Sequence, residues 1–192
     1  MKMVAIIKDT FVLFIITFIL VLSVAFVKVS IQDIVDASNN AAAMKAYVEV
    51  CPDYASSENI QNDVVGASAG FDASLNGDDA VLRCKNSKDE IIGYIVKCTS
   101  KGFGGPLNLI VGFDKSAKIT GVRYAETPKE TPGIGMKTTE MPFLNSWVGH
   151  SSNDVSTVDT ISGATVSSTA FKEAMSLACM FANRAATMDG GI

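Results

Sequence analysis

The distribution of hydrophobic and polar residues separates an uncharged N-terminal run from a mixed remainder. No charged residue occurs from Thr10 to Val27, "TFVLFIITFILVLSVAFV". An apolar run of about 18 residues is close to the shortest helix that spans a bilayer core. The sequence therefore predicts a cytoplasmic stub at 1–9 and a transmembrane helix at 10–28.

The same run also has features of a secretory signal peptide, because Lys2 and Lys8 form a basic start. The run is longer than a signal-peptide core, and no small-residue cleavage site follows at once, so we favour an uncleaved anchor. The positive-inside rule places Lys2 and Lys8 in the cytoplasm, although Lys28 weakens the bias. We expect a single-pass protein of the cytoplasmic membrane with the remaining residues on its extracytoplasmic side.

Beyond the anchor, the pattern alternates between helical and strand periods. Apolar residues at helical spacing predict a juxtamembrane helical segment at 29–50. The polar, Gly/Ala/Ser-rich stretch 52–79 predicts a loop with at most a short helix. Four Val/Ile/Leu-rich runs separated by turn compositions predict strands at 79–85, 90–100, 106–114 and 118–126.

The C-terminal third returns to helical spacing. One or two helical turns are predicted at 141–148, and Val166–Ala186 carries apolar residues three and four apart, typical of an amphipathic helix. Short links between the strands favour antiparallel pairing. The predicted fold is α+β: an N-terminal transmembrane helix, then a domain at 51–192 with an antiparallel sheet and flanking helices.

Charge and composition exclude several functions. The net charge of −4 argues against nucleic-acid binding, which needs a basic patch. The chain has one histidine and no G-x-S-x-G motif to supply a nucleophile beside it, so we predict no catalytic residue. We predict no metal site, because the four cysteines form no C-x-x-C pair. Their disulfide state stays open; they are Cys51, Cys84, Cys98 and Cys179.

A small-residue stretch, Ser162-Gly163-Ala164-Thr165, directly precedes the predicted terminal helix. Thr165 falls at the N-terminal boundary, where unpaired N–H groups and the helix dipole favour a phosphate. Serine and threonine are also the commonest helix caps. The pattern alone leaves a helix cap and a phosphate site equally open.

Three stretches resemble signatures of one family. Asp159 to Thr165, "DTISGAT", resembles the flavinylation motif D-x-x-[ST]-G-A-[TS] of the FMN-binding domain family, found in the G-type subunit of the Rnf complex and the C-type subunit of the sodium-pumping NADH:quinone oxidoreductase. Glu130 to Gly135, "ETPGIG", resembles a second signature, E-T-P-G-[LI]-G, and "KGFGGPLNLIVGFD" resembles a third. The short length is closer to that of the Rnf member.

The resemblance implies that FMN is joined through its phosphate to the Thr165 hydroxyl by a separate flavin transferase that uses FAD. It makes Asp159 part of the recognition motif, while Ser162, Gly163 and Ala164 leave room for approach. The second signature would lie against the flavin; it consists of Glu130, Thr131, Pro132, Gly133, Ile134 and Gly135. An earlier "ETP", Glu126-Thr127-Pro128, lacks the following Gly-x-Gly, so we assign the role to the later copy.

The flavin ring also needs flat apolar walls. Four residues are candidates, each equally able to be ordinary core: Phe103, Tyr94, Trp147 and Met136.

Taken together, the resemblance implies an electron-transfer subunit with covalent FMN in a membrane-bound Rnf-type ion-translocating ferredoxin:NAD oxidoreductase. Its partners would be the other subunits, and it would bind neither NAD nor ferredoxin itself. Two alternatives stay open: a counterpart of the C-type subunit in a sodium-pumping NADH:quinone oxidoreductase, and an anchored binding or assembly module without flavin. The pumped ion is not predicted.

Overall fold

The computed structural model describes residues 14–15, 17–18, 43–64 and 73–190. The predicted stub at 1–9 lies outside these residues, and so do most of the predicted transmembrane helix and the first part of the segment 29–50. Residues 14, 15, 17 and 18 are helical. In the described part of the chain, no helix is both long enough and apolar enough to cross a membrane. The anchor stays a prediction.

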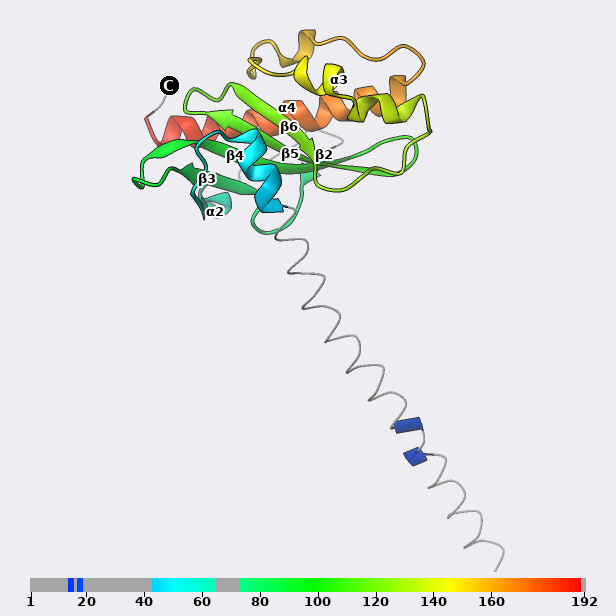
Figure 1. Cartoon of the computed structure of the whole chain (residues 1–192), viewed down its shortest axis with the longest axis horizontal. Coiled ribbons are helices and arrows are strands. Elements are labelled where there is room, and N and C mark those ends of the chain that lie inside the picture. The colour runs from blue at the N-terminus through cyan, green and yellow to red at the C-terminus, as the bar shows by residue number, and fades with distance from the viewer. Residues whose placement is uncertain (1–13, 16, 19–42, 65–72, 191–192) are drawn as a thin grey trace, which may run out of the picture. The chain divides into compact units, whose positions relative to one another are not determined.

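The domain is built on one antiparallel sheet (Figure 1). The strand order is β1-β3-β4-β5-β6, and β2 pairs with the end of β4 that β3 does not reach. The six strands are β1 (Ser56–Asn59), β2 (Ala73–Leu75), β3 (Val81–Lys85), β4 (Ile91–Lys101), β5 (Pro106–Asp114) and β6 (Ile119–Tyr124). The sheet confirms the four predicted strands and the antiparallel α+β domain. The prediction of a loop with at most a short helix for 52–79 was wrong in part, because this stretch also holds β1 and β2; the short helix is α2 (Gln61–Val64).

Helices cover both faces of the sheet. On one face lies α4 (Thr165–Met188), which buries residues such as Phe171 and Met175 in the larger apolar cluster. On the other face, the helical residues 43–50 pack Tyr47 and Val50 in a smaller cluster with Leu82, Ile95 and Ile110. Strands buried on both sides carry apolar residues at consecutive positions, which explains the runs in β4 and β5.

Two glycines let the end of the 43–50 helix touch the sheet. A Cβ added at Gly112 would lie 2.1 Å from the Val50 carbonyl oxygen, and one at Gly121 would lie 3.0 Å from the Val50 Cα. The Thr120 hydroxyl donates a hydrogen bond to the same carbonyl. The backbone at Val50 is therefore seated directly on β5 and β6.

After β6 the chain crosses to the start of α4 through short helices: η1 (Gly135–Thr139), α3 (Met141–Asn145) and η2 (Val155–Thr157). Phe143 and Trp147 pack on Phe171 of α4, with ring centroids 5.0 Å and 5.3 Å away. This aromatic contact holds the crossing segment against α4, and α3 lies beside α4 in the cartoon (Figure 1). The helix α3 confirms the helical turns predicted near 141–148.

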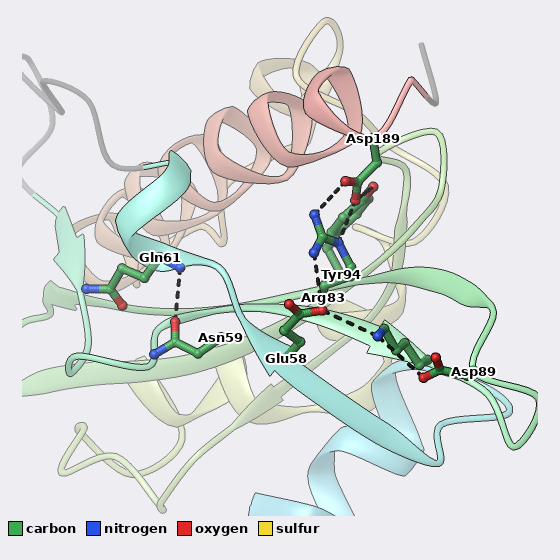
Figure 2. A network of polar contacts seen from close by, with 8 residues as sticks. Glu58, Asn59, Gln61, Arg83, Asp89, Tyr94 and Asp189 are labelled. Atoms are coloured by element: carbon green, nitrogen blue, oxygen red, sulfur yellow. Dashed lines mark hydrogen bonds and ion pairs between the residues drawn. The ribbon is translucent and has the colours of Figure 1, made fainter.

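A polar network fixes the C-terminal end of α4 to the sheet (Figure 2). Asp189, directly after α4, accepts hydrogen bonds from Arg83 Nε at 2.8 Å and Arg83 Nη2 at 2.5 Å. The Tyr94 hydroxyl donates to Asp189 Oδ2 at 2.9 Å. Arg83 also pairs with Glu58 of β1 at 3.3 Å, so the network joins α4, β3, β4 and the edge strand.

Candidate functional site

A cavity of about 500 Å³ lies at the N-terminal end of α4. Three separate parts of the chain line it: the turn between β4 and β5, the stretch before η1, and the first turn of α4. The lining residues are Phe103, Glu130, Thr131, Ile134, Gly135 and 163–167. Folding thus brings all three motifs found in the sequence to one cavity.

Thr165 is the first residue of α4, and its side chain is exposed. The cap position belongs to Ala164, and no side chain makes a capping hydrogen bond. Within the described residues the Thr165 hydroxyl has no hydrogen-bond partner. Thr165 therefore does not cap the helix, and its oxygen is accessible at the cavity wall.

The backbone around Thr165 offers unpaired donors. The amide of Ala164 donates to Ile161 O at 3.0 Å, and the amide of Ser168 donates to Ala164 O at 2.9 Å. Between them, the amides of Thr165, Val166 and Ser167 have no acceptor among the described residues. Free amides at the N-terminus of a long helix favour an anion such as a phosphate. The first turn of α4 therefore fits the phosphate of FMN.

Glu130 joins the three walls of the cavity and is only 7% exposed. Its Oε1 accepts a hydrogen bond from the amide of Gly104 at 3.1 Å, and its Oε2 accepts one from the Ser167 hydroxyl at 2.7 Å. A Cβ at Gly102 or Gly135 would lie 2.2 Å from a carboxylate oxygen of Glu130. The glycines of both motifs thus make room for this one carboxylate.

The earlier "ETP" lies elsewhere. Glu126 is exposed and accepts a hydrogen bond from Asn108 Nδ2 at 2.7 Å. It does not line the cavity, which agrees with the choice of the later copy. The roles of Gly102, Gly104 and Ser167 were missed in the sequence, since nothing in their local pattern shows that Glu130 lies beside them.

Four other predicted residues are not part of the cavity wall. Asp159, Ser162, Pro132 and Gly133 are exposed and do not line it. Gly133 has φ +72° and Gly163 has φ +83°, conformations that suit glycine and turn the chain on either side of the cavity.

Only one of the four candidates for the ring wall borders the cavity. Phe103 lines it and is 72% exposed. Tyr94 and Trp147 are each 1% exposed and belong to the core, and Met136 is half-buried outside the lining. Phe103, with the exposed side chains of Ile134 and Val166, forms an apolar rim around Thr165. In the described residues there is no cluster of metal-ligating side chains.

The sequence matches the model of a known protein family. The model of the family described as "FMN-binding domain" matches residues 102–179. The resemblance to the FMN-binding domain family is confirmed. The matched segment begins at the glycine turn, contains both later motifs and ends within α4, so the FMN-binding domain match includes every residue that lines the cavity.

A relative with a known role gives a second comparison. The chain is 32% identical over 115 residues to the G-type subunit of the ion-translocating oxidoreductase complex of Methanosarcina acetivorans. The aligned part covers 55% of this chain and 61% of the relative. The chain therefore spans about three fifths of the length of that relative.

Proposed function

We propose that this chain is an electron-transfer subunit that carries FMN covalently, through a phosphoester to Thr165. The observation that carries the proposal is the exposed, unbonded Thr165 hydroxyl, at a cavity lined by all three motifs of the family. The free amides of 165–167 support a phosphate at this place.

The attachment reaction needs help from outside the chain. The Thr165 oxygen would attack the phosphorus that carries the riboflavin part of FAD, the pyrophosphate bond would break, and AMP would leave. An aliphatic hydroxyl needs a base or a metal to become a nucleophile. In the described part of the chain no side chain bonds the Thr165 hydroxyl. The activating group would therefore belong to the flavin transferase.

The chain's own residues would hold and shape the bound group. The amides of 165–167 would bind the phosphate oxygens, and the rim of Phe103, Ile134 and Val166 would offer apolar surface to the ring. Glu130 would act indirectly, by keeping the glycine turn and α4 in place. The bound flavin would supply the electron transfer itself.

The assembly is part of the same proposal. The relative is the G-type subunit of an ion-translocating oxidoreductase complex, which supports a place for this chain in such a complex. The resemblance of the motifs implies the Rnf type, which would couple ferredoxin and NAD to ion movement. The chain would keep its N-terminal anchor in the cytoplasmic membrane, with the FMN domain outside the cytoplasm. The alternative is the role of the C-type subunit in a sodium-pumping NADH:quinone oxidoreductase, which has other partner subunits. The proteins that copurify with the chain therefore distinguish this complex from an Rnf-type complex.

The test is to coexpress the full chain with a flavin transferase and examine it on a denaturing gel. We expect flavin fluorescence on the wild-type band and an intact mass increased by one FMN group. Thr165→Ala should fold and carry no flavin, because the Thr165 side chain makes no capping bond. Thr165→Ser should keep part of the label.

Thr160→Ala is the matched control, because Thr160 is an exposed hydroxyl residue at a free position of the motif and does not line the cavity. It should keep the fluorescence. Covalent flavin on the Thr165→Ala chain, or none on the wild type, would refute the attachment. The assembly module without flavin would then be the better explanation.

A further inference from the structure

Two of the four cysteines lie together on the face of the sheet that α4 does not cover. Cys51 follows the helical residues 43–50, and Cys84 lies in β3. Both belong to the smaller apolar cluster, together with Tyr47 and Val50. Cys51 is 2% exposed and Cys84 is fully buried.

The backbone explains why the two residues meet. The amide of Tyr54 donates to Cys51 O at 3.2 Å and closes a turn after the helix. The amide of Ala55 then donates to the carbonyl oxygen of Lys85, the neighbour of Cys84, at 2.9 Å. The turn at 51–55 therefore leads the chain directly from the helix end onto β3.

The two thiols interact with each other. A hydrogen bond with the Cys84 thiol lowers the pKa of Cys51. The pKa of Cys84 is raised, first by its hydrogen bond with Cys51 and then by burial. Both shifts have the same main cause, the closeness of the two thiols within the smaller apolar cluster.

The other two cysteines behave differently, although both are also buried. The Cys98 thiol is directed to the carbonyl oxygen of Ala174, 3.4 Å away. Burial raises the pKa of the Cys179 thiol to about 12. Burial, and then the charge of Cys179, raises the pKa of Cys98, but no hydrogen bond between these two thiols contributes. The second pair therefore serves as an internal control.

We propose that Cys51 and Cys84 form a disulfide in the mature protein and so bind the 43–50 helix covalently to the sheet. This proposal rests on the proposed extracytoplasmic location, because disulfides persist in oxidising compartments. The oxidant is a disulfide-bearing thiol oxidoreductase. A thiolate of one cysteine attacks its disulfide, the other cysteine resolves the mixed disulfide, and the oxidant leaves as a dithiol.

Burial sets the order of events. Exchange requires an accessible sulfur, and both sulfurs are covered once the helix rests on the sheet. The bond therefore forms before the helix docks. The loop that it closes contains the edge strand β1, all four of whose side chains are exposed. Closing a loop of this length stabilises the fold mainly because it restricts the unfolded chain.

The test uses the full chain in its natural membrane. Cells are quenched with acid, denatured without reductant and treated with an alkylating reagent, and the cysteine peptides are mapped by mass. We expect alkylation at Cys98 and Cys179 only, with the peptides of Cys51 and Cys84 joined until a reductant is added. Alkylation of all four cysteines, or a bond to Cys98 or Cys179, would overturn the proposal.

Three variants sharpen the test. Cys51→Ala should release Cys84 for alkylation, whereas the matched Cys98→Ala should leave the bond intact. Reductant should lower the unfolding temperature of the wild type by roughly 10 °C. It should not change that of the double variant Cys51→Ala/Cys84→Ala; an equal shift in both would also count against the bond. Flavin fluorescence is read separately on the same gel, so a chain without flavin still reports its cysteines.

Discussion

A single carboxylate, that of Glu130, connects the three walls of the cavity. It is buried, and each of its oxygens accepts a hydrogen bond from a different segment, one from Gly104 and one from Ser167. The side chain has little freedom, since Gly102 and Gly135 press against it. A change at this residue should therefore alter the shape of the whole cavity.

Glu130→Gln tests this role. The glutamine oxygen can still accept from the Gly104 amide, but the NH₂ group must donate to the Ser167 oxygen. The Ser167 hydroxyl proton then loses its acceptor, and the hydrogen bonds to a charged carboxylate are replaced by weaker, neutral ones. We expect a loss of roughly 1–3 kcal/mol in the free energy of unfolding and slower flavin attachment. Urea unfolding and the time course of in-gel fluorescence measure the two effects.

Glu126→Gln is the matched control, because Glu126 occurs in the same tripeptide but is exposed. We expect a change within about 0.5 kcal/mol and unaltered labelling. If both variants behaved alike, Glu130 would have no special part in the site.

At the scale of single residues, the sequence predicted the residues of the motifs but not the residues that contact Glu130. Glu130 and Thr165 were found because they belong to recognisable signatures. Ser167 was missed, and Gly102 was included only as part of the glycine-rich signature. The importance of both lies in contacts with Glu130 from positions 37 and 28 residues away. Local pattern carries no information on such contacts.

At the scale of elements, α4 is held at its C-terminal end by the Arg83–Asp189–Tyr94 network. Asp189→Asn should leave Arg83 without its strongest partner. We expect a loss of roughly 1–3 kcal/mol in the free energy of unfolding. Asp79→Asn is the control, because the Asp79 side chain in the pair with Lys97 is 60% exposed, and such pairs contribute about 0–1 kcal/mol.

The same network predicts a pH dependence. Hydrogen bonds from Arg83, and then from Tyr94, hold the pKa of Asp189 below its ordinary value. The carboxylate therefore stabilises the fold fully above the pKa of an unfolded aspartate, about 3.9. That contribution is lost as the pH falls through the lower, folded pKa.

Unfolding measured from pH 6 down to pH 2 checks this dependence. The wild type and Asp189→Asn should differ most at pH 6 and converge in acid. A constant difference over the whole range would mean that the charge of Asp189 is irrelevant. Asp79→Asn should follow the wild type throughout.

Elements were predictable where their own side chains are buried. β4, β5 and α4 bury long apolar runs, and the sequence showed them nearly to their ends. β1 was missed because its residues, Ser56 to Asn59, are polar and all exposed. Its pairing depends on backbone hydrogen bonds with β3, which no local pattern reveals.

At the scale of the whole molecule, the domain needs a cover on both faces of its sheet. Residues 43–192 group as one compact unit that includes the 43–50 helix. We expect a chain that starts at residue 43 to fold, and one that starts at residue 52 to be less stable by roughly 3–6 kcal/mol. This estimate counts the lost burial of Tyr47 and Val50.

Urea unfolding in the presence of reductant compares the two truncations without any effect of Cys51. The shorter chain should also bind a dye for exposed apolar surface, since Leu82, Ile95 and Ile110 lose their cover. Equal unfolding midpoints would show that the 43–50 helix is dispensable.

The length of α4 has a consequence for all of these measurements. Its 24 residues span about 36 Å, with Thr165 at one end and Asp189 just beyond the other. Fraying that starts at the Asp189 end must pass through several buried turns before it reaches Thr165. Loss of the contacts at the Asp189 end therefore leaves the first turn of the helix unchanged. A chain can thus have a lower unfolding temperature and still present an intact acceptor hydroxyl at Thr165.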